Sequence, residues 1–147
     1  MSLLQRKRLS PQQSRSAALE AARALLMEEG AAAVTLQSVA KRVGRTHANL
    51  LHHFGSAAGL QQALAEDIAR TVAASIEEAI QQRREGHGTE RDVINAMFDA
   101  FRREGAGELI GWIALTRQRE ALEPIVQTIE RIIRVMRALG DERPVDR

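Results

Sequence analysis

The 147-residue sequence predicts an all-α protein. Residues that favour strands are scarce, because aromatic residues make up 3% of the chain and tyrosine is absent, whereas Ala, Leu, Glu, Gln and Arg are abundant. Apolar residues also recur at helical spacing along most of the chain. With no cysteine, disulfides, thiolate catalysis and cysteine-based zinc sites are excluded. The fold must therefore be stable through packing alone.

Charge divides the chain into two parts. Residues 1–55 contain eight Lys or Arg and three Glu, whereas residues 56–147 contain thirteen Lys or Arg and sixteen Asp or Glu. A basic front with a mildly acidic rear fits a head that binds a polyanion, joined to a body with another role. No run of eighteen apolar residues occurs, and the start, MSLLQRKRLS, lacks the hydrophobic region of a signal peptide. We therefore expect a soluble, cytoplasmic protein.

The N-terminal part begins with a basic arm and a scaffold helix. Residues 1–10 hold Arg6, Lys7 and Arg8 with little to bury, so they form either an arm that touches phosphate or the minor groove, or a solvated tail. From Pro11 or Ser14 to residue 29, the spacing predicts a helix that stops at Gly30. The apolar face of this helix consists of Leu19, Ala22, Leu25 and Leu26. We expect this face to cover the segment that follows.

Residues 35–54 predict two short helices that meet at one glycine. In the first helix, Val39, Ala40 and Val43 share one face. Gly44 ends this helix, and Leu50 and Phe54 hold the second helix to it, since they lie at i and i+4. Thr35 and Thr46 each precede a helix, where a hydroxyl can accept a hydrogen bond from an unpaired backbone N–H. This is the outline of a helix-turn-helix.

The outward side of the second short helix suits the major groove of DNA. It carries His47, Asn49, His52 and His53, and the cations nearby are Lys41, Arg42 and Arg45. The groove admits one helix, amides and imidazoles can meet base edges, and cations neutralise phosphates. An amide can pair with adenine, so Asn49 is the best candidate for a base contact. The bland alternative is a short solvated helix in an ordinary bundle.

The run VTLQSVAKRVGRTHANLLHHFGSAAGL resembles the N-terminal DNA-binding domain of the tetracycline-repressor (TetR) family of transcriptional regulators. The matching residues are Thr35, Val39, Ala40, Gly44, Thr46, Leu50, His53, Phe54, Ser56 and Leu60. The resemblance implies DNA contacts from Arg45, Thr46, His47, Asn49, His52 and His53, with Thr35 and Gln37 near the DNA backbone from the preceding helix. Two positions depart from the family pattern, because Leu51 replaces a common tyrosine and Ala57 a common lysine. Both losses remove phosphate contacts, so either affinity is lower than in relatives or Lys41 and Arg45 compensate.

A long helix is predicted to connect the two parts. Ser56 caps it, and it reaches about Arg83 or Arg84. Its large apolar residues are Leu60, Leu64, Ile68, Val72, Ile76 and Ile80. Because 3.6 residues make a turn, a spacing of four winds this stripe around the axis, so the helix faces two different bodies. It would link them mechanically, and its first N–H groups, at Ser56 to Ala58, could seat a DNA phosphate.

Further helices are predicted in the rear. Thr89 caps one that ends at Gly105-Ala106-Gly107, another covers residues 109–119, and the last has Pro124 in its first turn and stops at Gly140. The last helix carries a packing seam of Ile125, Ile129, Ile132, Met136 and Leu139. Met97, Phe98, Phe101, Trp112 and Leu115 either line a pocket for an apolar or aromatic effector, as the resemblance implies, or are simply core. Relatives usually continue through two more helices that form the dimer interface. Either the seam takes over dimerisation or the sequence lacks its C-terminal portion, which we favour.

Catalytic and metal sites find no support in the sequence. No two histidines lie at the i, i+4 spacing that chelates zinc, and no nucleophile elbow, phosphate loop or acidic cluster occurs. We expect no cofactor, no metal and no enzymatic activity. The predicted architecture is a three-helix helix-turn-helix domain, residues 1–55, joined by a long helix to a C-terminal bundle, residues 56–147. The predicted function is a ligand-responsive repressor that binds a palindromic operator as a homodimer. The alternative is a helical protein-interaction module without DNA binding.

Overall fold

The computed structural model describes residues 8–116, 120 and 123–141, and the side chains of residues 115, 116 and 139–141 lie outside the description. These residues form seven α-helices, one short 3-10 helix and no strand, so the all-α prediction is confirmed. The chain divides into two compact units, one up to Leu60 and one from Gln61 onward. We call them the head and the rear unit.

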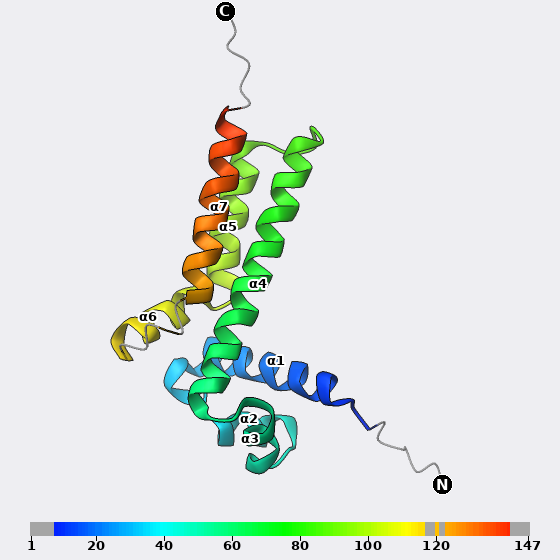
Figure 1. The fold of residues 1–147 in the computed structure, drawn as a ribbon, viewed down its shortest axis with the longest axis vertical. Helices are drawn as coiled ribbons and strands as arrows, with labels where there is room; N and C mark the ends of the chain where they lie inside the picture. Colours follow the sequence, from blue (N-terminus) through cyan, green and yellow to red (C-terminus); the bar gives the residue numbers. More distant parts are fainter. Residues whose placement is uncertain (1–7, 117–119, 121–122, 142–147) are drawn as a thin grey trace, which may run out of the picture. The chain divides into compact units, whose positions relative to one another are not determined.

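Three α-helices and the 3-10 helix build the head before α4 begins (Figure 1). They are α1 (Pro11–Glu29), η1 (Ala31–Ala33), α2 (Leu36–Val43) and α3 (His47–Phe54). α1 packs on α2, and α2 packs on α3. The buried side chains come from all three α-helices and include the predicted scaffold face of α1: Leu19, Ala22, Leu25, Leu26, Val39, Ala40, Leu50 and Phe54. The helix-turn-helix is thus held by a small apolar core.

The ends of the short helices follow the predicted capping residues. Thr35 caps α2, Thr46 caps α3, and Gly44 lies between the two helices in the left-handed conformation with a φ of 67°. The sequence allows α1 to start at Pro11 or at Ser14, because both residues can begin a helix. Ser10 is the cap, and the side chain of Gln13 returns a hydrogen bond to the backbone N–H of Ser10 at 2.9 Å. This reciprocal pair fixes the helix start at Pro11.

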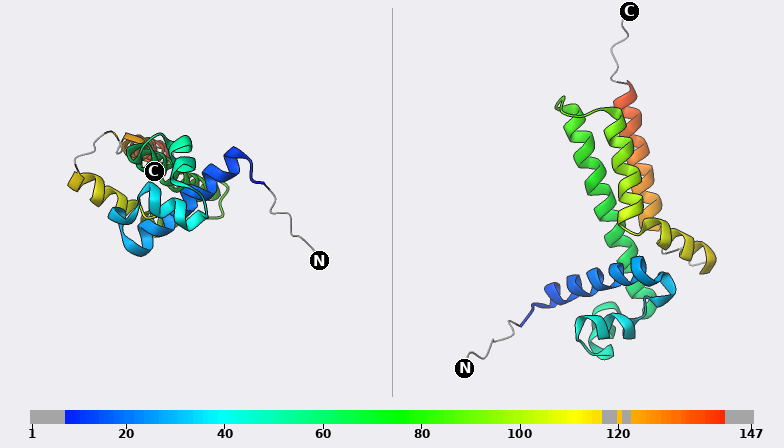
Figure 2. Two further views of the ribbon diagram at one scale, coloured as in Figure 1. Left: turned by 90° about the horizontal axis from the view of Figure 1, so that it is seen from below. Right: turned by 180° about the vertical axis from the view of Figure 1, so that it is seen from behind.

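Four helices belong to the rest of the chain. They are α4 (Ala57–Arg84), which starts in the head and continues through the rear unit, α5 (Glu90–Arg103), α6 (Ala106–Thr116) and α7 (Glu123–Asp141). In the rear unit α4, α5 and α7 run side by side (Figures 1 and 2). Their shared core consists of Ile76, Ile80, Val93 and Ile132, with Val72, Met97, Val135 and Met136 packed at its edge. The cap at Thr89 and the position of Pro124 in the first turn of α7 are as predicted.

Two predicted helix ends are wrong. The run Gly105-Ala106-Gly107 is not a break throughout, because Gly105 has a φ of 76° whereas Ala106 and Gly107 already belong to α6. Gly140 does not stop the last helix, since α7 continues to Asp141. A glycine permits a left-handed turn but does not impose one, so its presence alone does not end a helix.

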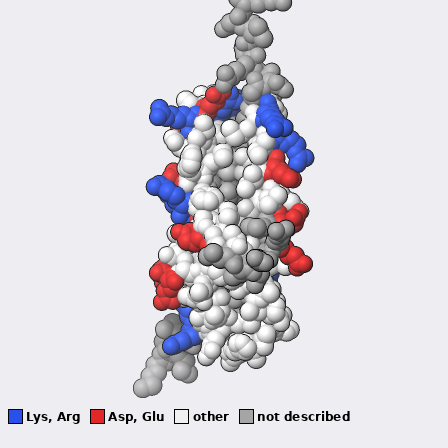
Figure 3. Space-filling view, turned by 90° about the vertical axis from the view of Figure 1, so that its left-hand side faces the viewer, with Lys and Arg blue, Asp and Glu red and all other residues white. Residues whose placement is uncertain are grey.

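Large apolar side chains of α5 and α7 are exposed on the rear unit. They are Ile94, Phe98 and Phe101 of α5, and Val126, Ile129 and Ile133 of α7. Of the predicted seam on α7, Ile125 and Ile132 are buried but Ile129 is 45% exposed. Figure 3 faces the left-hand side of Figure 1, and its described surface shows uncharged side chains between edges that carry Lys, Arg, Asp and Glu. Among the described residues, no helix is long and apolar enough to cross a membrane.

Candidate nucleic-acid interface

α3 separates a buried side from an exposed side over only eight residues. Leu50 is 0% exposed and Phe54 9%, and both face the head core. The remaining positions are open or half-open: His47, Ala48, Leu51 and His52 are exposed, and Asn49 and His53 are half-buried. Of the four polar residues predicted to meet DNA from this helix, Asn49, His52 and His53 line one hollow, and His47 is exposed at the start of the helix.

Hydroxyl groups at the helix starts have a structural task. The Thr35 hydroxyl accepts from the backbone N–H of Ser38 at 3.1 Å, and the Thr46 hydroxyl accepts from that of Asn49 at 3.1 Å. Ser56 does the same for Gly59 at 2.9 Å, at the start of α4. A hydroxyl that accepts in a cap still has a proton to donate, so capping leaves Thr46 and Ser56 able to make the predicted contacts to phosphate oxygens. The Thr35 hydroxyl also lies 2.8 Å from the Ser38 hydroxyl, which donates to the carbonyl of Ala33. Thr35, Thr46 and Ser56 orient the helices that would approach the DNA.

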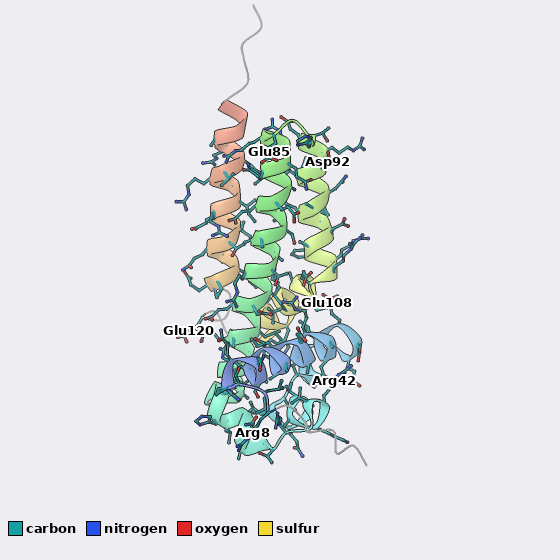
Figure 4. The ribbon with its side chains drawn as sticks, turned by 90° about the vertical axis from the view of Figure 1, so that its right-hand side faces the viewer. Arg8, Arg42, Glu85, Asp92, Glu108 and Glu120 are labelled. Carbon is teal, nitrogen blue, oxygen red and sulfur yellow. The ribbon has the colours of Figure 1, made fainter. Side chains whose placement is uncertain are left out.

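The cation Arg42 is engaged inside the head. Its guanidinium forms a two-pronged ion pair with Glu28 of α1, with N–O distances of 2.8 and 2.9 Å. The hydrogen bond from Arg42 holds the pKa of the Glu28 carboxyl below its usual value, and the same bond raises the pKa of Arg42. Figure 4 labels Arg42. The sequence groups Arg42 with Lys41 and Arg45 as cations for phosphate. In the structure Arg42 ties α2 to α1, and all three residues are exposed.

The start of α1 lies beside the exposed side of α3. Between them is a hollow of about 460 Å³. Its walls are Arg8, Leu9, Pro11 and Ser14 on one side, and Arg45, Asn49, His52 and His53 on the other. Arg8, the last cation of the predicted basic arm, is labelled in Figure 4. Ser14 was not predicted as a site residue, because periodicity indicates only which face of α1 is apolar.

Two further contacts fix the C-terminal end of α3. The guanidinium carbon of Arg15 lies 5.2 Å from the centre of the Phe54 ring, a cation–π geometry that joins α1 to α3. The rings of His52 and His53 lie edge to face with centres 5.8 Å apart.

Thr35 and Gln37 are both exposed, at the start of α2. The predicted DNA-contacting residues thus lie on α2, α3 and the junction between them, with Ser56 at the start of α4.

Residues 18–64 match the family model described as bacterial regulatory proteins, tetR family. This head is a TetR family DNA-binding domain. No curated protein and no solved structure matches the chain at a significant level. The family model describes bacterial regulatory proteins, so the match supports a DNA-binding transcriptional regulator.

The residues predicted to line an effector pocket differ in their surroundings. Met97 packs against the core of the rear unit, Phe98 and Phe101 are 67% and 45% exposed, and Trp112 is half-buried on α6. The side chain of Leu115 lies outside the described residues. A different hollow, of about 420 Å³, lies between α4 and α7, with Ala69 and Ala73 at its floor and Arg70 and Arg131 among its walls. The effector pocket stays a prediction.

Proposed function

We propose that this TetR regulator represses transcription by binding an inverted-repeat operator as a homodimer. The observation that carries the proposal is the exposed polar side of α3, which Leu50 and Phe54 hold out from the head. In this proposal α3 of each copy lies in the major groove, and the two half-sites are about 34 Å apart, one turn of DNA. Such a regulator acts in the cytoplasm, with the DNA that it binds.

Within each half-site the residues take different roles. Asn49 reads an adenine edge, with His47 and His52 beside it, because amides and imidazoles can bond to bases. Contacts to phosphates fix the register, and they come from Thr35, Gln37, Lys41, Arg45, Thr46, His53 and Ser56. Arg8 and Arg45 face the same hollow beside Asn49, so a second cation joins Arg45 there. This supports compensation for the phosphate contacts that Leu51 and Ala57 cannot make.

Selection of bound DNA from a random pool tests the proposal. We expect an enriched inverted repeat, retained at low salt and released steeply as salt rises. Asn49→Ala should then relax sequence preference at one position, whereas Lys41→Ala should weaken all sequences alike and lower the salt slope by about one. If no sequence is enriched and DNA is not retained even at low salt, the alternative, a protein-interaction module, replaces this proposal.

We propose that the second copy pairs through the exposed apolar side chains of α5 and α7. Taking about 200 Å² for a fully exposed phenylalanine and somewhat less for Ile and Val, the six side chains leave roughly 500 Å² open on each copy. This exposed area equals that of a large functional patch on a monomer. The residues around it would extend the buried area toward the ~800 Å² per partner of a stable complex. A second copy of this chain supplies the same apolar face in return, as a two-fold interface requires.

Self-association can be tested with a matched pair of variants on the rear unit. Phe98→Glu puts a charge on the most exposed phenylalanine of α5, and Ala74→Glu puts the same charge on an exposed position of α4. By analytical ultracentrifugation, we expect Phe98→Glu to shift the protein toward monomer and Ala74→Glu to leave it unchanged. Equal behaviour of both variants and the parent protein would remove this face from the proposal.

The response to an effector is proposed from the family and from the continuity of α4. α4 starts in the head and runs through the rear unit, so a ligand in the rear unit can change the spacing of the two heads. It does so only to the extent that it prefers one spacing over the other. A small apolar or aromatic compound that raises the melting temperature should therefore lower operator affinity. Tight binding without a change in operator affinity would contradict this coupling.

A further inference from the structure

The outer side of α3 carries an apolar patch next to its hydrogen-bonding groups. Leu51 is 39% exposed, and Ala48, one turn earlier on the same side, is also exposed. His47 and His52 flank this pair, since Leu51 follows His47 by four residues and His52 follows Ala48 by four. The patch therefore lies between two histidines that are proposed to meet base edges in the groove.

Neither residue belongs to the buried core of the head. The buried positions of the helix are Leu50 and Phe54, which are 0% and 9% exposed. A single exposed leucine on an ordinary surface needs no explanation. This one, however, lies on the side that DNA would cover, where its open surface would lose contact with water on binding. Its partner in the groove must then be apolar, because a base hydrogen-bonding group facing it would be left unpaired.

Base edges in the major groove offer one methyl group. It is the 5-methyl group of thymine, which presents more apolar surface than the C5–H of cytosine at the same position. We infer that Leu51, together with Ala48, contacts the 5-methyl group of a thymine in each operator half-site. The inference rests on the proposed function, which leaves this base unidentified, and it identifies the base as thymine. Leu51 thus determines sequence specificity at a position where the family's tyrosine would reach for phosphate.

Replacing thymine by deoxyuridine tests this contact directly. The exchange removes the methyl group and leaves every hydrogen-bonding atom of the base in place. Each thymine of the selected operator is exchanged in turn, symmetrically in both half-sites, and binding is measured with the unaltered protein. One methyl group lost from an apolar contact corresponds to about 0.8 kcal/mol, or about fourfold in affinity. We expect this loss per half-site at one thymine position and little change at the others.

Two variants assign the methyl contact to the side chain. Leu51→Ala should bind thymine and deoxyuridine operators equally, because the apolar contact is gone, whereas Leu51→Met should keep the preference. Leu51 is exposed, so neither variant should change the melting temperature beyond the small effect usual for surface positions.

The outcomes separate this inference from the proposed function. Enrichment of an operator that shows no sensitivity to deoxyuridine overturns the role of Leu51 and leaves operator binding intact. The same holds if Leu51→Ala keeps the full preference for thymine. If no operator is enriched, the proposed function fails, and the thymine contact fails with it.

Discussion

Gly59 offers a sharp test of how α4 joins the recognition helix. It lies in the first turn of α4, and a Cβ placed on it would fall against the backbone carbonyl oxygen of Phe54, closer than real Cβ atoms come to any neighbour. Phe54 is the last residue of α3, and a backbone carbonyl cannot rotate away as a side chain can. Gly59→Ala must therefore displace the start of α4 from the end of α3.

The size of the effect follows from two opposing contributions. Alanine favours a helix over glycine by about 0.5–1 kcal/mol. Forcing an extra methyl group into a close contact costs about 1–3 kcal/mol, and toward the upper end when the neighbour is backbone. The net expectation is a loss of about 1–2 kcal/mol. For a domain the size of the head, this lowers the melting temperature by roughly 4–16 °C.

Gly111→Ala is the matched control. Gly111 lies inside α6, and a Cβ on it would meet nothing within 4 Å. The same substitution should therefore leave thermal stability unchanged or raise it slightly. Both variants can be compared with the parent protein by circular dichroism during heating, and operator binding should fall only for Gly59→Ala. A Gly59→Ala protein that melts at or above the parent temperature would refute the close approach of α4 to α3.

Three other substitutions probe caps and charges. Thr46→Ala removes the cap of α3 and should destabilise the head by about 1 kcal/mol in denaturant titration, with Thr46→Ser close to the parent protein. The hydrogen bond from Arg42 lowers the pKa of Glu28 in the folded state. The ion pair therefore stabilises the fold above pH 4.5, the usual pKa of a glutamate, and this stabilisation is lost as the pH falls below it. Glu28→Gln should flatten the dependence of stability on pH in this acid range. Backbone and hydroxyl bonds from Thr89, both 2.7 Å long, lower the pKa of Asp92 in the same way from 3.8. Asp92→Asn should therefore flatten the acid titration of the rear unit below that pH, and an unchanged profile would contradict the assignment.

Much of the head could be predicted from local chemistry. The caps at Thr35 and Thr46, the turn at Gly44 and the buried pair Leu50 and Phe54 are all confirmed, because each depends on residues a few positions apart. Contacts between helices that are distant in sequence could not be predicted in this way. The ion pair that Arg42 forms within the head depends on Glu28, fourteen residues earlier.

The rear unit shows where periodicity stops being informative. The spacing of Phe98 and Phe101 correctly places them on an apolar face of α5, but both are exposed rather than inside a bundle. An apolar stripe indicates that a surface is suited to burial and does not indicate whether the same chain covers it. For the same reason, spacing alone could not distinguish Ile132, which is buried, from Ile129, which is not.

The division of α3 into a buried and an open side has a consequence for how such a regulator changes its target. The stability of the head depends on the buried side chains Leu50 and Phe54, whereas the exposed side chains of α3 do not belong to that core. Ala48, Leu51 and His52 can therefore be exchanged with little cost to folding. New operators become accessible through single substitutions, which makes this helix a natural starting point for directed evolution of DNA preference.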